Sequence, residues 1–200
     1  MLRRERSFWI KKYYANSADR VRQDLIFLMI ILGIDPGTAT LGWGIIKKSQ
    51  ISNLPESYRN EAGKSQNFGV IRTSPKLSDS ERLATISNEL IEIIKKYQPE
   101  RVAVEKIFFF KNQKTIITVT QARGVVLCEC AKLGLEVFEY TPLEVKMAIC
   151  SYGRADKEQV QKMVMLHLGL NEIPQPDDAA DALAVAICCA NSQTNSGIYD

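Results

Sequence analysis

The feature that most constrains this chain is the stretch from Met29 to Lys48, MIILGIDPGTATLGWGIIKK, in which an apolar run ends in a single acid. The run before Asp35 is rich in β-branched residues, Pro36-Gly37 turns the backbone, and a second apolar segment follows. Two such segments around a turn predict two strands joined by a hairpin. Because a buried carboxylate is unfavourable unless a cation meets it, Asp35 is either a turn-capping acid or part of a cation-binding site.

The rest of the chain alternates short strand patterns with helical patterns. Capping-box signals at Ser78 and Asp156 precede apolar residues at helical spacing, and short β-branched runs lie between the helices. We expect strands over 29–35, 41–48, 68–72, 101–105 and 135–140, and helices over about 78–97, 113–132, 141–149, 156–168 and 177–191. This order predicts an α/β domain whose mixed sheet has five strands, three antiparallel and then two parallel, flanked by helices.

Composition places the chain among single-domain globular proteins. Hydrophobic residues make up 46% and charged residues 24% of the 200 positions, and no apolar run approaches the roughly 18 to 20 residues that span a bilayer. The five cysteines are an odd number without the spacing of a zinc site, which favours reduced core thiols. We therefore expect a cytoplasmic protein with no membrane contact.

Residues 1–28 are expected to lie outside the fold. They carry seven basic and three acidic side chains, so their net charge is +4, and with a total of +3 the remainder carries −1. They lack the apolar core of a signal peptide, and Met29, directly before the first strand, is an alternative start. We assign the domain to 29–191, with a basic extension before it, a long hairpin tip over 49–67 and a polar tail over 192–200.

Four acids are placed where a mixed sheet would gather them. Asp35 and Glu105 both end apolar strands, and Asp178 and Asp181 stand three residues apart on one face of the last helix. Such a cluster repels itself unless cations compensate it, and an all-oxygen ligand set suits Mg²⁺ or Mn²⁺. Two such ions about 4 Å apart would serve phosphodiester hydrolysis. Each acid also has a structural alternative, such as stabilising a helix N-terminus or pairing with a neighbouring lysine.

Several motifs resemble the RuvC family of Holliday-junction resolvases. They are GIDPGT at 33–38, the glutamate within VAVEKIFFFKN at 102–112, QARG at 121–124 and DDAADALAVAI at 177–187. The N-terminal 28 residues have no counterpart in the family pattern, and the segment 49–67 is longer than usual, so nothing carries over to it. It implies a ribonuclease-H-like fold and a Mg²⁺-dependent endonuclease that cuts four-way DNA junctions symmetrically in recombination and repair.

The resemblance also implies site residues and partners. Carried over position by position, it makes Asp35, Glu105, Asp178 and Asp181 the catalytic and metal-binding residues, with two Mg²⁺ ions per active site and Mn²⁺ as a substitute. It further implies a homodimer, and a branch-migration motor complex as the partner that delivers the junction.

Basic and aromatic side chains supply the candidate DNA contacts. The loop KIFFFK combines three aromatics with lysines, and this pairing suits contacts with unpaired bases at a junction. The alternative interpretation is that its phenylalanines pack inward. The DNA-binding candidates are Phe108, Lys111, Arg123, Lys146, Arg154 and Lys157, of which Phe108, Lys146 and Lys157 are taken from the resemblance. Because the domain itself carries a net charge of −1, we expect these few side chains to carry much of the affinity and binding to depend strongly on salt.

The helix over 113–132 is apolar around an unusually wide arc. At about 100° per residue its apolar side chains cover roughly 240°, against the stripe of about 100° that one buried face needs. We therefore expect a second buried surface on this helix, at the interface of a twofold dimer that supplies two identical sites for two cuts. Charges at Val119, Ala122 and Val126 are expected to test that interface.

Three other functions compete with the nuclease assignment. Gly-Ile-Asp-x-Gly-Thr after a strand also begins the phosphate loop of actin-like kinases, but that fold needs a second domain and a second phosphate loop, neither of which is found in this sequence. Another enzyme of the same fold, such as a ribonuclease or a transposase-type nuclease, is the second alternative. A junction-binding protein without chemistry is the third, and the complete acid set argues against it.

Overall fold

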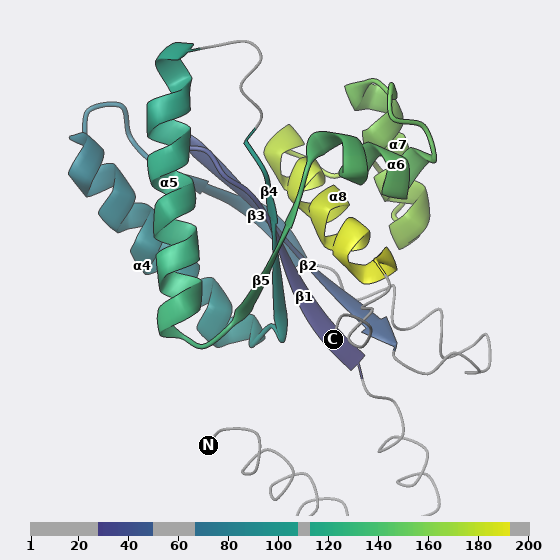
Figure 1. Cartoon of the computed structure of the whole chain (residues 1–200), viewed down its shortest axis with the longest axis horizontal. Helices are drawn as coiled ribbons and strands as arrows, with labels where there is room; N and C mark the ends of the chain where they lie inside the picture. The colour runs from purple at the N-terminus through teal and green to yellow at the C-terminus, as the bar shows by residue number, and fades with distance from the viewer. Residues whose placement is uncertain (1–27, 50–66, 108–112, 193–200) are drawn as a thin grey trace, which may run out of the picture.

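The computed structural model describes residues 28–49, 67–107 and 113–192, which form a central sheet with helices on both faces (Figure 1). The strands are β1 (Leu28–Asp35), β2 (Thr40–Ser49), β3 (Asn67–Arg72), β4 (Arg101–Glu105) and β5 (Glu136–Tyr140). The helices are α4 (Asp79–Tyr97), α5 (Gln113–Lys132), α6 (Pro142–Cys150), α7 (Lys157–Leu168) and α8 (Asp177–Asn191). The predicted order of elements is confirmed, and the predicted ends agree with these bounds to within one residue.

The five strands form one mixed sheet in the order β3-β2-β1-β4-β5. The pairs β1–β2 and β2–β3 are antiparallel, whereas β4 runs parallel to both β1 and β5. The predicted sheet of three antiparallel and two parallel strands is confirmed, and it is the arrangement that a ribonuclease-H-like fold implies. The predicted extensions and hairpin tip fall almost entirely on 1–27, 50–66 and 193–200, outside the described residues.

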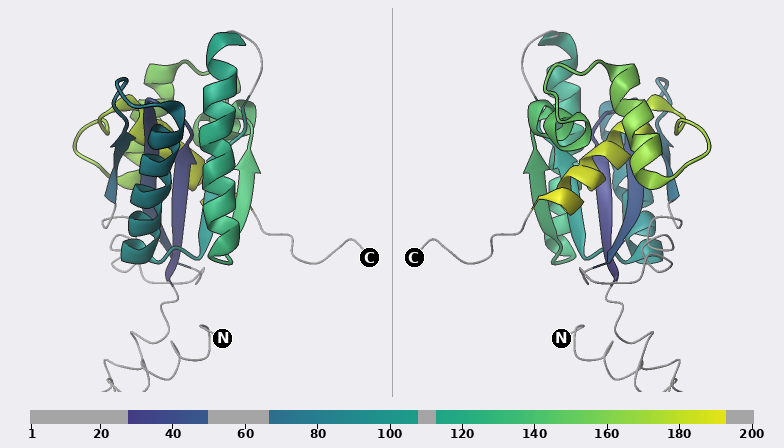
Figure 2. Two further views of the ribbon diagram at one scale, coloured as in Figure 1. Left: turned by 90° about the vertical axis from the view of Figure 1, so that its left-hand side faces the viewer. Right: turned by 90° about the vertical axis from the view of Figure 1, so that its right-hand side faces the viewer.

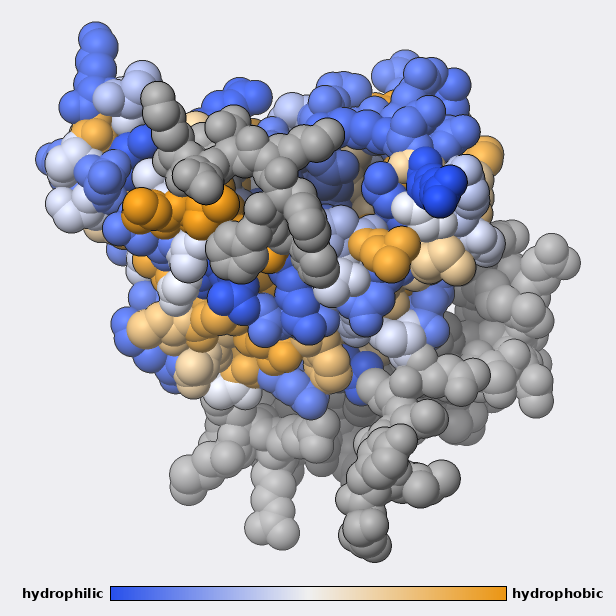
Figure 3. Space-filling model, turned by 45° about the horizontal axis from the view of Figure 1, so that its top comes forward, coloured by the Kyte–Doolittle hydropathy of each residue, from blue (hydrophilic) through white to orange (hydrophobic). Residues whose placement is uncertain are grey.

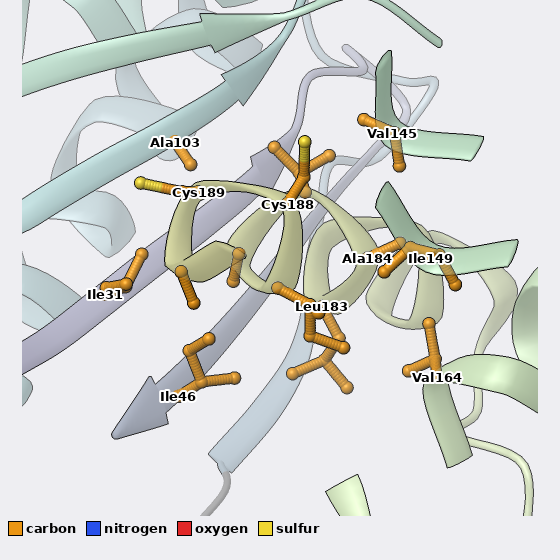
Figure 4. Close-up of a cluster of buried hydrophobic side chains, with 14 of the residues drawn as sticks. Ile31, Ile46, Ala103, Val145, Ile149, Val164, Leu183, Ala184, Cys188 and Cys189 are labelled. Carbon is orange, nitrogen blue, oxygen red and sulfur yellow. The ribbon is translucent and has the colours of Figure 1, made fainter. Parts of the chain in front are cut away.

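Alternation along the strands sends side chains into two separate cores. On β1, Leu32 and Ile34 face a core shared with α4 and α5, while Ile31 faces a core shared with α6, α7 and α8. Figure 2 shows these two helical layers on opposite faces of the sheet. In the second core, side chains from the sheet, α6 and α7 surround α8 (Figure 4). By the same alternation, Asp35 lies on the α8 face of the sheet.

Glycines on the sheet let α8 approach its backbone. A β-carbon at Gly42 would lie 1.9 Å from the carbonyl oxygen of Asp178, and one at Gly33 would lie 2.0 Å from that of Ala182. A side chain at either position would push α8 away from the sheet. Because α8 is apolar around most of its circumference, eleven of its residues are buried between the sheet, α6 and α7. This packing places the start of α8 beside the end of β1.

α5 buries only one of its faces. Ala122 and Val126 are fully buried against the sheet and α4, whereas Ile117 and Gly124 lie exposed on the opposite face. The proposal to probe a dimer interface with charges at Ala122 and Val126 was therefore wrong, because those charges would enter the core. Val119, the third chosen position, is half-buried.

The cysteines are free thiols in different surroundings. Cys130, Cys188 and Cys189 are buried, but Cys128 is exposed on α5, so the prediction of core thiols is wrong for Cys128. Its position, half a turn from buried Cys130, explains the difference. Within the described ranges, no helix combines the length and the apolar character needed to cross a membrane.

Candidate active site

Two acids end neighbouring strands at one edge of the sheet. β1 and β4 run parallel with Ile34 opposite Val104, so the next residues, Asp35 and Glu105, adjoin at the carboxyl ends of the strands. Glu105 projects to the α8 face together with Asp35, because Ala103, two residues earlier, packs in the α8 core. Both acids are half-buried. The sheet alone thus brings two carboxylates together.

The start of α8 supplies the other two acids. Asp178 and Asp181 lie in the first two turns of α8, and the backbone of Asp178 contacts Gly42. Since Gly42 pairs with Asp35 across the hairpin, this contact brings the start of α8 over the end of β1. The charges of Glu105, Asp181 and Asp178 all act on Asp35. The structure therefore gathers the four acids named from the sequence.

Burial and mutual repulsion keep protons on this cluster. The pKa of Asp35 is raised to about 8, mainly by burial and further by the charges of Glu105, Asp181 and Asp178, while Lys157 opposes the rise. Burial, and then the charge of Asp181, raise the pKa of Glu105 to about 7. Burial also raises the pKa of Asp181, although Lys157 acts against it. Near neutral pH, part of the cluster is therefore protonated unless a cation enters.

Lysines from α6 and α7 compensate the cluster in part. Lys157, the first residue of α7, places its Nζ 3.2 Å from Oδ2 of Asp181 and 3.2 Å from Oδ2 of Asp177. Burial acts to lower the pKa of Lys157, but the charge of Asp181 and hydrogen bonds to both aspartates raise it overall. Lys146 on α6 opposes the larger effect of burial on the pKa of Glu105. Even with these lysines, the pKa values of Asp35, Glu105 and Asp181 stay raised.

The donor set fits hard divalent cations. The four side chains offer only carboxylate oxygens, which Mg²⁺ and Mn²⁺ prefer, at a place where the protein's own cations do not neutralise them. As they stand, no three acidic, histidine or cysteine side chains of the described ranges surround one point closely enough to hold an ion. Lys157 takes an oxygen of Asp181 in this arrangement, so metal binding requires Lys157 and the carboxylates to rotate.

The loop that follows Asp35 is tied to two helices. Thr38, which is 5% exposed, donates from Oγ1 to the carbonyl oxygen of Thr118 on α5 at 2.5 Å, and its own carbonyl oxygen accepts from Oγ1 of Thr73 at 2.6 Å. Nε of Arg82 on α4 donates to Oγ1 of Thr73 at 2.8 Å. These bonds hold the loop three residues beyond Asp35. These bonds were not predictable from the sequence, because a threonine in a turn carries no signal for partners so distant in the chain.

Two predicted DNA contacts act on the acids, a third is exposed, and a fourth forms an ion pair with β5. Lys157 and Lys146 act on the acids as described, and Arg154 is exposed between α6 and α7. Arg123 forms an ion pair with Glu139 on β5, so it holds α5 against the sheet. Its predicted contact with DNA stays a prediction.

On the face of the molecule shown in Figure 3, hydrophilic side chains surround separate apolar patches. Tyr152, which is 55% exposed, lies two residues before Arg154 and was missed as a candidate for stacking on a base. The remaining two predicted contacts, Phe108 and Lys111, lie outside the described residues.

Comparisons with known proteins agree on one family. The family model described as Crossover junction endodeoxyribonuclease RuvC matches residues 31–189. The RuvC crossover junction endodeoxyribonuclease of Heliobacterium modesticaldum is 51% identical over 168 residues, which span 83% of this chain and 96% of the relative. That of Caldicellulosiruptor saccharolyticus is 52% identical over 160 residues, 80% of this chain and 91% of the relative. Among solved structures, T. thermophilus RuvC in complex with a Holliday junction substrate matches with a TM-score of 0.70 and 36% identity, covering 81% of this chain and 93% of that chain.

Proposed function

This chain belongs to the RuvC family of crossover junction endodeoxyribonucleases, and we propose that it resolves four-way DNA junctions by two symmetric cuts. The observation that carries this proposal is the gathering of four carboxylates at one edge of the sheet, on the motifs that mark the family. The T. thermophilus relative was solved with a Holliday junction substrate, which supports the same class of substrate here. Family membership removes the kinase alternative.

The proposed cofactor is a pair of Mg²⁺ ions, with Mn²⁺ as a substitute, held by Asp35, Glu105, Asp178 and Asp181. Bound there, such ions activate a water molecule and stabilise the leaving oxygen of the phosphodiester. Because burial raises the pKa of Asp35 to about 8 and that of Glu105 to about 7, these carboxyl groups must lose protons before they serve as ligands. We therefore expect metal binding to release protons and cleavage to rise between roughly pH 6 and 8.

The cations beside the acids are proposed to hold the DNA backbone. Lys146 on α6 and Lys157 on α7 act on the carboxylate cluster, and Arg154 is exposed on the segment that joins these helices. Phe108 and Lys111 are proposed to reach the junction from the loop after β4. Since the lysines and Arg154 would contact phosphates through their charge, affinity for the junction is expected to fall steeply with salt.

A cleavage assay tests the proposed reaction. Purified protein is given a synthetic four-way junction, a linear duplex and an RNA–DNA hybrid, each with and without Mg²⁺. We expect Mg²⁺-dependent paired nicks in the four-way junction alone, and no cleavage by Asp35→Asn, Glu105→Gln, Asp178→Asn or Asp181→Asn, each of which should still bind the junction. Cleavage of the hybrid would favour a ribonuclease, and binding without cleavage by the unaltered protein would favour a junction-binding protein. Near-normal turnover in any two of the four variants would contradict the metal assignment.

The proposed active form is a homodimer that uses the exposed face of α5. Two identical sites at a fixed spacing match two symmetric cuts. The exposed residues Ile117, Gln121, Gly124 and Cys128 recur every three or four positions and so share one face. Ile117 is 66% exposed on it, and the opposite face of α5 is already packed.

Ile117→Glu tests this interface, because the charge enters the exposed face and leaves the core intact. Leu166→Glu is the matched control, since Leu166 is an equally apolar side chain, 65% exposed, on α7. Sedimentation equilibrium should show a folded monomer for Ile117→Glu and a dimer for Leu166→Glu. The monomer should nick one strand without the matched second cut. A dimeric Ile117→Glu protein would place the interface elsewhere.

The proposed setting is homologous recombination and DNA repair in the cytoplasm, where a branch-migration motor complex delivers the junction. Family membership supports this setting. Pull-down of the purified motor complex by this protein, with and without junction DNA, tests the partnership.

A further inference from the structure

Lys157 is shared between one acid of the proposed metal set and one acid outside it. Its Nζ lies 3.2 Å from Oδ2 of Asp181, a proposed metal ligand, and 3.2 Å from Oδ2 of Asp177, which has no part in that set. The Asp177 side chain is 54% exposed, whereas that of Asp181 is 31% exposed. Asp177 therefore stands on the solvent side of the site, and Asp181 on the metal side.

The N-terminus of α7 fixes the backbone position of Lys157. Asp156 caps the helix, accepting a hydrogen bond from the backbone of Gln159 at 2.8 Å, so the backbone of Lys157 is held at the first helical position. One turn later on the same helix, the Gln161 side chain is 8% exposed. Its Nε2 makes no hydrogen bond of good geometry among the described residues, yet its amide lies near Asp177. Lys157, and then Gln161, lower the pKa of Asp177, so that acid keeps its charge.

We propose that Asp177 is a positioning residue that holds Lys157 at the edge of the site when Asp181 binds a divalent cation. Held there, the Lys157 ammonium is directed at the DNA backbone. This inference rests on the proposed function, since it needs a metal ion on Asp181. The oxygen of Asp181 that now accepts from Lys157 cannot serve both partners, and a divalent ion repels the ammonium. Asp177, outside the metal set, is then the only anion of the pair still available to Lys157.

A double-mutant cycle on single-turnover cleavage of a synthetic four-way junction tests this inference. At saturating Mg²⁺ we expect Asp177→Asn to slow cleavage about tenfold, the factor that losing one charge-assisted hydrogen bond produces. In the Lys157→Met background, Asp177→Asn should have no further effect, because it acts only through Lys157. Glu158→Gln is the matched control: it also removes one exposed carboxylate that pairs with a lysine on α7, Lys162, and should leave the rate unchanged. If the fold reductions in cleavage rate caused by Asp177→Asn and Lys157→Met multiply in the double variant, the inference is overturned.

Amine labelling gives a second readout that does not depend on cleavage. With an acylating reagent and mass spectrometry, Lys157 should react several-fold faster in Asp177→Asn than in the unaltered protein when Mg²⁺ is present. Without Mg²⁺ the difference should shrink, because Asp181 still holds the ammonium. Lys162 should react equally in both proteins. If unaltered protein cleaves the junction but Asp177→Asn does not change the labelling of Lys157 in Mg²⁺, the inference fails and the proposed function stands; if unaltered protein does not cleave, the proposed function itself fails.

Discussion

Replacing Asp35 by asparagine should abolish cleavage and at the same time stabilise the metal-free protein. Burial raises the pKa of this carboxyl from 3.8 to about 8, so the folded protein binds a proton there over a pH range in which the unfolded chain releases it. The stability that this group contributes is fully present below about pH 4 and is lost as the pH rises through about 8. The asparagine side chain has nearly the shape of the protonated acid but cannot ionise.

The size of the effect follows from the two pKa values. Above pH 3.8, each increase of one pH unit removes about 1.4 kcal/mol of the free energy of unfolding, until the folded-state pKa is reached. The loss is then about 2 kcal/mol at pH 5 and about 4 kcal/mol at pH 7. These are upper values, because Asp35 is partly exposed and its pKa depends on the charge of Glu105. Asp35→Asn recovers most of this loss, and the gain should grow with pH.

Urea unfolding in EDTA at pH 5 and pH 7 measures the gain. The control is Glu89→Gln, which removes an exposed carboxylate on α4 and should change stability by less than about 0.5 kcal/mol at either pH. Saturating Mg²⁺ should then stabilise the unaltered protein and leave Asp35→Asn nearly unchanged. A variant that is less stable than the unaltered protein, or a gain that does not depend on pH, would refute the account of Asp35 as a desolvated, repelled carboxylate.

Three further outcomes are expected. Thr38→Val should lower the free energy of unfolding by about 1–2 kcal/mol, because it deletes a buried donor, and Thr38→Ser should restore most of it in urea unfolding. Gly42→Ala should destabilise the fold by about 1–3 kcal/mol and slow cleavage, because its β-carbon meets the Asp178 carbonyl oxygen, while Gly69→Ala, whose β-carbon would meet only side-chain atoms 3.1 Å away, should leave cleavage intact. A protein that starts at Met29 should fold and cut junctions at the normal rate; a loss of junction affinity at fixed salt would give the basic extension a role in binding.

The fold was predictable because local signals and burial agree along most of the chain. The capping boxes read at Ser78 and Asp156 form as expected, and β1 alternates between two cores because both faces of the sheet are covered. The α5 helix shows where this reasoning stops. Its wide apolar arc indicated two packed surfaces, but periodicity cannot say which surface meets the core. The structure assigns Val126 to the core and leaves Ile117 exposed.

The four acids could be named from sequence because each sits at a strand end or a helix start within a family motif. Their electrostatic coupling could not, since it depends on how closely α8 lies against the sheet. The pairing of Lys157 with Asp177 was missed for the same reason: the two residues start different helices and meet only through tertiary packing. Charge and motif identify residue types, whereas only the packed structure shows which charges repel one another and which share a lysine.

Apolar packing of α8 explains how the fold tolerates a cluster of carboxylates that destabilises it. Holding Asp35 protonated in the fold, at a pH where the unfolded chain ionises, removes up to about 4 kcal/mol of the free energy of unfolding at pH 7. Full burial of Leu183, Val185 and Ile187 on the same helix contributes roughly 5–9 kcal/mol, which offsets that loss. The glycines of the sheet are what allow this burial, because they let the helix lie directly on the strands. A substitution at Gly42 should therefore weaken both effects together: it separates the acids, which relieves their repulsion, and it unpacks the helix, which removes the stabilisation that held them.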